Sequence, residues 1–174
     1  MKRGLTWIIL FALGVAQAQT PAGPSPEMKK LEVQNGEWVG KAKNYMTPGE
    51  PPILTDVSLK IEFVMGGMYQ RTQYFSEIPG AGKLEGVVMV GWDAAKGAYR
   101  SQNYNNFIPV PVEELSKWEG DAVVGKTAPL EAFGGMIQHT RMQLKGKNEL
   151  LYKIEAEIGD QRTPMMEMEL KRKK

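Results

Sequence analysis

The feature that most constrains the fold is a two-residue period of apolar side chains, which begins near Glu37 and continues to the end of the chain. The clearest run alternates Val57, Leu59, Ile61 and Phe63 with polar neighbours. This period is typical of strands with one polar and one apolar face, whereas a helix would repeat every 3.6 residues. Strands are expected at residues 37–46, 54–64, 68–76, 84–92, 98–105, 112–119, 121–127, 136–145, 149–158 and 163–172.

The links between these runs are short, as in "DAAKG" at residues 93–97 and "GKNE" at residues 146–149. Short links join strands that are neighbours in a sheet, which indicates an up-and-down meander. An open sheet of about ten strands would leave two unpaired edges, and closure removes them. We therefore predict an all-β fold, a single antiparallel up-and-down β-barrel of about ten strands.

A short helix is expected ahead of the first strand. Ser25 suits the N-cap and Pro26 suits the first helical position. Met28 and Leu31 share a face of this helix, and the dipeptide "NG" at residues 35–36 supplies a stop signal.

The N-terminal segment has the order of a secretory signal peptide. Lys2 and Arg3 precede an apolar run at residues 5–15, and small residues follow at Ala16 and Ala18. The apolar run is shorter than the roughly 20 residues that a membrane-spanning helix needs. We expect residues 1–18 to be cleaved and the product to be exported, as a soluble periplasmic or extracellular protein.

Cleavage after Ala18 removes Lys2 and Arg3 and leaves 20 basic residues against 20 acidic ones. A chain of zero net charge has no summed field to attract nucleic acid or an anionic membrane, so neither is expected as a partner. Residues 19–24 are expected to be a flexible leader, and residues 25–174 to be one barrel domain.

The composition also limits the chemistry. The chain has no cysteine, which excludes disulfides and thiolate ligands, and it has one histidine. It contains no Gly-x-Ser-x-Gly, His-Glu-x-x-His or phosphate-loop motif. Glu113 and Glu114 are adjacent in a strand and point to opposite faces, so they cannot form a carboxylate pair. The sequence favours a protein that is not an enzyme.

Several motifs carry a family resemblance. "GEWVG" at residues 36–40 resembles the Gly-x-Trp opening of calycin barrels, the superfamily of the lipocalins and the fatty-acid-binding proteins. In order and spacing, four further stretches are similar to the bacterial family catalogued as domain of unknown function 1579: "MTPGEPP" at 46–52, "GGMY" at 66–69, "GWD" at 91–93 and "MMEMELKRK" from Met165. The resemblance implies a calycin-like barrel and brings no established activity.

The chain departs from the family pattern at three places. Trp92 stands where the family usually shows Tyr, and Met68 stands where it shows Arg. The stretch "YRSQNYNN" at residues 99–106 also differs from the family's Trp and Asp. If these positions line the family's cavity, the ligand of this member differs.

The resemblance also implies a structural role for Trp38. In calycins an arginine from a late strand commonly lies over the tryptophan of the first strand and closes one end of the barrel. Arg172 or Arg141 would take that role here, stacking on Trp38 and placing its charge on carbonyl groups.

A barrel of this strand count is too wide for its own side chains to fill, so we expect its interior to bind a small, mostly apolar molecule. Trp38, Tyr69 and Trp92 are the candidate wall residues, with Arg141 as an internal polar contact. A set of tyrosines and amides on neighbouring strands suits a pocket with one polar end, or else cross-strand pairing on the outer face. Its members are Tyr69, Tyr74, Tyr99, Gln102, Asn103, Tyr104 and Asn105.

His139 raises the question of haem, because a single histidine holds haem iron in the nitrobindin branch of the calycins. The strand pattern opposes this role. Thr140, Met142 and Leu144 form the more apolar face, and His139 lies on the other face with Arg141. We therefore expect no cofactor, and haem bound by His139 is the less favoured alternative.

Met165, Met166 and Met168 offer thioethers of the kind that bind Cu(I). Met166 and Met168 nevertheless lie on the apolar face of their strand, which favours packing over metal binding. No metal site is expected.

The alternative function is that of an interaction or structural module. Such a protein would dock another envelope protein through an outer face or through the "IPVPVEEL" stretch at residues 108–115.

Overall fold

The computed structural model describes residues 23–47 and 49–174. The predicted signal peptide and most of the predicted leader lie outside the described residues. Two short helices come first, α1 (Pro26–Lys30) and the 3-10 helix η1 (Leu31–Gln34). The strands are β1 (Gly36–Asn44), β2 (Ile53–Val64), β3 (Tyr69–Ile78), β4 (Gly82–Asp93), β5 (Ala98–Asn105), β6 (Val112–Glu119), β7 (Ala122–Thr127), β8 (Ile137–Lys145), β9 (Glu149–Ile158) and β10 (Gln161–Arg172). Two more 3-10 turns, η2 (Met65–Gly67) and η3 (Glu131–Phe133), lie in the links.

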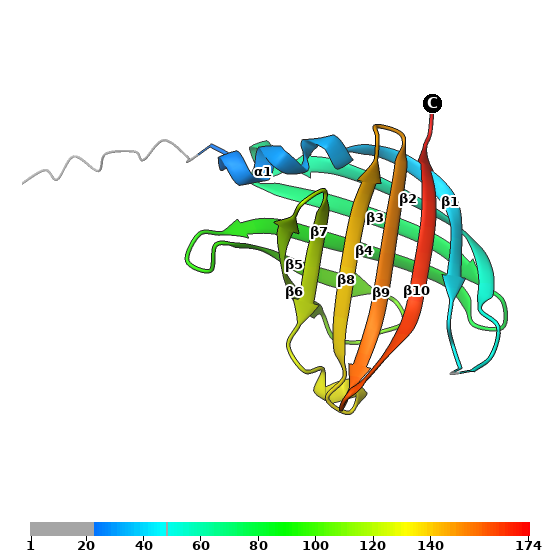
Figure 1. Cartoon of the computed structure of the whole chain (residues 1–174). Coiled ribbons are helices and arrows are strands. Elements are labelled where there is room, and N and C mark those ends of the chain that lie inside the picture. Colours follow the sequence, from blue (N-terminus) through cyan, green and yellow to red (C-terminus); the bar gives the residue numbers. More distant parts are fainter. Residues whose placement is uncertain (1–22, 48) are drawn as a thin grey trace, which may run out of the picture.

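The ten strands form one closed antiparallel barrel. Every strand pairs with its neighbours in the sequence, and β1 pairs with β10 to close the sheet (Figure 1). In Figure 1, β8, β9 and β10 run upright in front of β2, β3 and β4, which run across the view, so opposite walls cross steeply. The predicted all-β, up-and-down barrel with a short N-terminal helix is confirmed.

Some strand limits differ from the prediction, because the ladder of backbone hydrogen bonds and the alternation of side chains do not end at the same residues. β4 begins at Gly82 and pairs there with Ile78, although the alternation starts only at Leu84. β1 ends at Asn44 instead of Met46. Backbone hydrogen bonds extend a ladder into the turn, where side chains need no period of two.

The register identifies the inner wall of the barrel. Trp38 pairs with Leu59 on β2, Leu59 pairs with Tyr74 on β3, and Trp38 pairs with Arg172 on β10. Residues that lie opposite each other point to the same face. The direction that the alternation left open on β3 and β5 is thereby settled: the inward residues are Gln70, Thr72, Tyr74 and Ser76 on β3, and Tyr99, Ser101, Asn103 and Asn105 on β5.

One side of the interior is packed with apolar side chains from β1, β2, β9 and β10. We call this group the apolar core: Trp38, Ala42, Val57, Leu59, Ile61, Leu150, Met168 and Leu170. Fully burying one large aliphatic side chain contributes about 1.5–3 kcal/mol. The apolar core is therefore the main source of stability on this side of the barrel.

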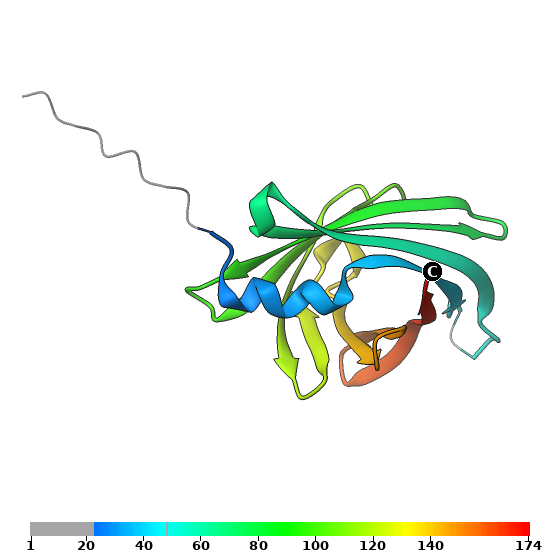
Figure 2. The ribbon, with the colours of Figure 1, turned by 90° about the horizontal axis from the view of Figure 1, so that it is seen from above.

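The helices lie across one end of the barrel (Figure 2). Ser25 caps α1 by accepting a hydrogen bond from the Met28 N–H at 3.2 Å. Met28 and Leu31 are almost fully buried and pack against Tyr99 of β5. The shared helix face seen in the sequence is thus the face that covers this end, which we call the closed end.

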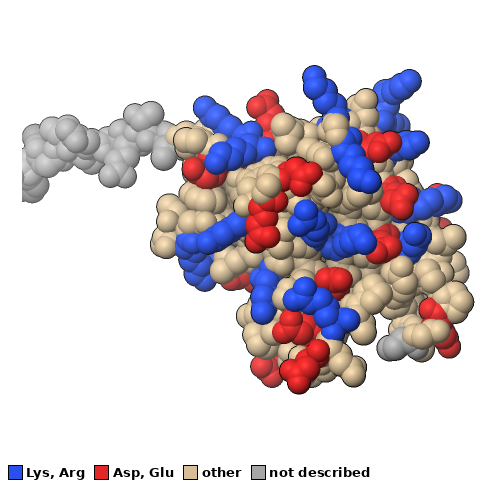
Figure 3. Space-filling view, viewed as in Figure 1, with Lys and Arg blue, Asp and Glu red and all other residues tan. Residues whose placement is uncertain are grey.

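Charges of both signs are mixed over the face of the molecule shown in Figure 3, and no large area of that face carries one sign alone. Among the described residues, no helix has the length and hydropathy required to cross a bilayer.

Candidate functional site

The closed end is fixed by Trp38 and Arg172. Trp38 is completely buried, and its indole Nε1–H donates to the Gln34 carbonyl at 2.9 Å. The Arg172 guanidinium carbon lies 4.1 Å from the centre of the Trp38 ring. Its nitrogens donate to the carbonyl oxygens of Asn35, Val33 (2.9 Å) and Lys147 (2.9 Å). Of the two arginines considered from the sequence, Arg172 makes this contact.

Two more inward side chains hold the helices against the barrel. The Tyr99 hydroxyl donates to the Glu27 carbonyl at 2.8 Å, and Gln70 Nε2 donates to the Leu31 carbonyl at 2.9 Å. Because these donors come from β3 and β5 while Trp38 comes from β1, the helices are attached around the rim of the barrel. A molecule inside the barrel would not pass this end without breaking them.

Away from the closed end, the inner wall also carries polar side chains. We call this group the polar wall: Tyr74, Ser101, Asn103, Glu114, Ser116, Thr127, Thr140 and Tyr152. The register places all of them on the inner face of β3 and β5 to β9. Ser101, Ser116, Thr127 and Thr140 are buried, whereas the other four keep part of their surface accessible.

Glu114 lies in the middle of the polar wall. Its β6 position pairs with Ser101 on one side and with Thr127 on the other. The Thr140 hydroxyl donates to Glu114 Oε2 at 2.8 Å. Gly125 makes the space for this contact, because a Cβ there would overlap Glu114 Oε1 and lie 2.6 Å from Thr140 Oγ1.

The electrostatics of Glu114 follow from its burial. Removal from water disfavours the charged form and raises the pKa of this carboxyl to about 7, and the hydrogen bond from Thr140 opposes the rise. The register directs its side chain into the barrel. Glu114 therefore changes its charge near neutral pH.

Tyr152 and Tyr74 are two further ionisable groups of the polar wall. Burial raises the pKa of the Tyr152 hydroxyl, and the charges of Glu114 and Tyr74 raise it further. Burial also raises the pKa of Tyr74, against the hydrogen bonds with Asn103 and Asn105. Both phenols therefore stay neutral at physiological pH and act as hydrogen-bonding groups.

Tyr74 is held in place by Asn103 of β5, across the intervening strand β4. Its hydroxyl donates to Asn103 Oδ1 at 2.8 Å. Gly86 of β4 allows this approach, because a Cβ there would overlap the Tyr74 hydroxyl. Two glycines of the inner wall, Gly86 and Gly125, thus lie directly beneath two of its polar groups.

The structure distributes the sequence-predicted wall residues differently from the prediction. Trp38 belongs to the apolar core and has no accessible surface. Trp92 is inward and half-buried beside the closed end, with its ring edge-on to Tyr99 at 5.1 Å between centroids. Tyr69 and Arg141 lie on the outer face, so the interior position assigned to them from the sequence is wrong.

The physical reason is parity. Tyr69 pairs with Gly91 on the outside of the barrel and is 42% exposed. Arg141 pairs with Val124 on the outside, where its guanidinium lies 3.8 Å from Asp121. On both strands the two faces carry polar side chains, so the alternation gave no reliable direction.

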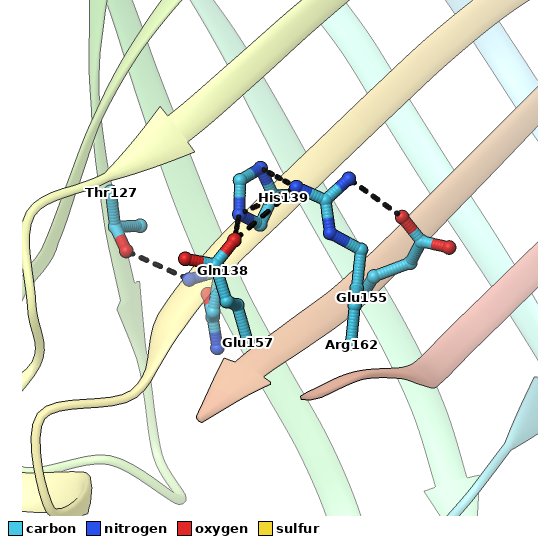
Figure 4. Close-up of polar contacts among 6 residues, drawn as sticks. All are labelled: Thr127, Gln138, His139, Glu155, Glu157 and Arg162. Atoms are coloured by element: carbon cyan, nitrogen blue, oxygen red, sulfur yellow. Dashed lines mark hydrogen bonds and ion pairs between the residues drawn. The ribbon is translucent and has the colours of Figure 1, made fainter. Parts of the chain in front are cut away.

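His139 also lies on the outer face. Its Nε2 is 2.7 Å from Glu157 Oε2, and Arg162 Nη2 lies 3.1 Å from the same ring nitrogen (Figure 4). Arg162 also pairs with Glu155 at 3.6 Å. A histidine in this surface ion-pair network cannot coordinate haem iron inside the barrel.

The methionines considered as copper ligands belong mainly to the interior packing. Met168 lies in the apolar core, and Met166 packs against it. Among the described residues there is no cluster of His, Asp and Glu side chains that would hold a metal ion.

Glu114 is a site residue that the sequence does not identify as one. Its adjacency to Glu113 excludes a carboxylate pair but does not show which of the two points inward. The sequence contains one indication of this position. Glu114 shares a strand face with Val112, Ser116 and Trp118, and a face that carries Val and Trp is a candidate for the inner one.

The barrel, its closed end and its polar interior define a class of protein: a closed ten-stranded β-barrel with a polar group inside it. Residues 23–172 match the family described as "Protein of unknown function (DUF1579)". The chain belongs to this family, as the motifs suggested. No curated protein matches the chain.

Proposed function

We propose that this protein is an exported barrel that binds a small, mostly apolar molecule in its interior without transforming it. The observation that carries the proposal is the incomplete burial of the inner wall. Tyr74, Val88, Met142 and Tyr152 point inward by register, yet all four keep accessible surface. Side chains that face inward and remain accessible indicate space inside the barrel, as expected for ten strands.

The chemistry of the wall supports a ligand with an apolar body and one polar end. Val88, Met142, Ile154 and Met166 offer apolar surface on the inner face. The polar-wall residues lie among these apolar side chains: Asn103 pairs with Val88, and Thr140 pairs with Ile154. Such a mixture is typical of sites that bury most of a ligand against apolar surface and fix its orientation with a few polar groups.

The entry route lies at the end opposite the helices. The closed end is blocked by α1 and η1, whereas the other end is bordered by the links β1–β2, β3–β4, β5–β6, β7–β8 and β9–β10. Loops open more readily than packed helices because fewer apolar contacts hold them.

Binding without catalysis is supported by the residues of the interior. Activating a serine or threonine hydroxyl as a nucleophile requires an adjacent base. His139, the single histidine of the chain, lies on the outer face, so no imidazole base faces the hydroxyls of the interior. Export is supported by the order of basic, apolar and small residues in the N-terminal segment.

The test is occupancy of the interior. Native mass spectrometry of protein purified from its own host should show a retained small molecule, and the delipidated protein should bind 1-octanol in calorimetric titrations. The variant Val88→Phe fills the inner wall and should abolish octanol binding. Val87→Phe changes the adjacent outward residue and should leave it intact. Equal binding by the two folded variants would refute an interior site.

A second candidate, the docking of another envelope protein, is favoured by one observation. A groove of about 740 Å³ lies on the outer face of β1 to β4, and the exposed side chains of Val39 and Phe75 line it. The variant Phe75→Asp should then prevent capture of a partner while leaving octanol binding unchanged.

A further inference from the structure

Glu114 is a carboxylate without a cation. Among the described strand residues that the register places inward, it is the only acidic one, and Arg172 is the only basic one. Arg172 lies at the closed end, over Trp38, with its nitrogens on three backbone carbonyls. The single hydrogen bond that Glu114 receives from a side chain comes from Thr140.

A buried carboxylate of this kind is costly unless something compensates its charge. The fold nevertheless provides space for it. Gly125 removes the side chain that would overlap Glu114, and the neighbouring positions carry only small hydroxyl residues. The small residues around Glu114 therefore leave room for its carboxylate.

The groups around Glu114 suit an ammonium ion. An alkylammonium has three N–H donors and no acceptor. Glu114 offers the charged acceptor, and the oxygens of Ser101, Ser116 and Tyr152 are further acceptors on the same wall. The apolar side chains of Met142 and Ile154 lie further along the wall, on β8 and β9, where they can contact a hydrocarbon chain.

We propose that the interior binds a primary amine with an apolar body, and that the ammonium head pairs with Glu114. This inference rests on the proposed function, because it assumes that the interior admits a ligand. It names the chemical class of that ligand.

Other ligand classes fit the wall less well. A carboxylate or phosphate head would meet the charge of Glu114 and no free cation. A bare divalent metal needs several oxygen ligands, usually with more than one carboxylate, and the wall offers one. An uncharged alcohol would leave the ionised Glu114 uncompensated.

Binding should also depend on pH in a defined direction. The groups that face Glu114 are the hydroxyls of Ser101, Thr127 and Thr140, and the phenols of Tyr74 and Tyr152, which stay neutral because their pKa values are raised. With the pKa of Glu114 raised to about 7, its charge appears between about pH 6 and 8. An alkylamine remains protonated there, so its affinity should rise across this range.

The experiment compares three probes of one chain length: n-octylamine, 1-octanol and n-octanoate, each titrated calorimetrically into the purified, delipidated protein at pH 8. A hydrogen bond to a charged group contributes enough for octylamine to bind about 10- to 100-fold more tightly than octanol, and octanoate should bind most weakly. Glu114→Gln should remove the preference for octylamine and leave octanol binding unchanged. Glu113→Gln alters the adjacent outward carboxylate and should behave as the wild type.

The outcomes separate this inference from the proposed function. Octanol binding that equals or exceeds octylamine binding, in the wild type, overturns the amine proposal and leaves the ligand-binding barrel standing. Failure of all three probes overturns both. Should Glu114→Gln not fold, the wild-type pH profile decides: an octylamine affinity that does not increase from pH 6 to 8 refutes the pairing with Glu114.

Discussion

The apolar core and the polar wall occupy the same barrel but follow different rules. In the apolar core, Trp38, Leu150 and Leu170 are at most 2% exposed, and the side chains fill the space between strands. In the polar wall, Glu114, Tyr74 and Tyr152 keep accessible surface, and glycines lie beneath two of them. Tyr74 and Tyr152 pack against the apolar core, so the two groups adjoin each other. They differ in how completely their side chains are buried, and we assign stability to the fully buried group and binding to the accessible one.

The comparison is tested most strongly at Trp38. Replacing Trp38 by Ala removes a fully buried indole and its hydrogen bond to Gln34, and should lower the free energy of unfolding by about 3–5 kcal/mol. Trp92→Ala should cost less, because Trp92 is only half-buried. Urea denaturation followed by circular dichroism measures both values. Equal losses would show that the interior around Trp92, beside the closed end, is packed as tightly as the apolar core.

Glu114 should make stability depend on pH. Its carboxyl ionises near its ordinary value of 4.5 in the unfolded chain and at about 7 in the folded chain. Between these values the unfolded state binds fewer protons, so the free energy of unfolding falls as the pH rises, in total by about 3 kcal/mol. Glu114→Gln should remove this fall and be more stable than the wild type at pH 8.

The control for that prediction is Glu113→Gln, since Glu113 is outward and should leave the fall between pH 4.5 and 7 in place. The ion-paired carboxyls of Glu62 and Glu167 have lowered pKa values, and their stabilisation is lost only when the pH falls further. Their contribution is common to all variants. An unchanged pH profile in Glu114→Gln would show that Glu114 is solvated.

Alanine substitutions at two inner-wall glycines, Gly40 and Gly125, distinguish an effect on stability from an effect on binding. A Cβ at Gly40 would overlap the backbone carbonyl of Glu169, whereas a Cβ at Gly125 would meet the side chains of Glu114 and Thr140. Backbone cannot rotate away, so Gly40→Ala should cost about 2 kcal/mol of stability. Gly125→Ala should cost less, because the Glu114 carboxylate can swing aside, and should instead abolish the preference for octylamine. Thermal unfolding and the octylamine titration test the two effects separately.

The sequence predicted the barrel because alternation and short links are local signals. The runs that include Leu59 and Leu150 have one apolar face, and each link joins neighbours, so closure follows once an open sheet is excluded. The same reasoning failed at Tyr69 and Arg141. Alternation assumes that the inner face is the apolar one, and it gives no direction where both faces are mixed.

Glu114 was missed for the same reason. The direction of a strand is inferred from the rule that its apolar face points inward. A polar inner wall breaks this rule, so the sequence does not show which face of such a strand lines the barrel. Only the closed register shows that Glu114, and not Glu113, is the inward residue and places it beside Ser101 and Thr127. Thr140, on a strand two positions away, cannot be paired with it from local sequence.

The smallest expected effect concerns the hydroxyl of Tyr74. Tyr74→Phe removes the hydrogen bond to Asn103 at 2.8 Å and leaves a partly buried amide without that partner, so it should cost about 1 kcal/mol. Tyr104→Phe removes a hydrogen bond of the same length, to Gln102, on the exposed outer face, where water replaces it at no measurable cost. Both losses can be measured by urea denaturation. If the two variants lose the same stability, the polar wall is as hydrated as the surface, and the inner and outer tyrosine hydroxyls do not differ.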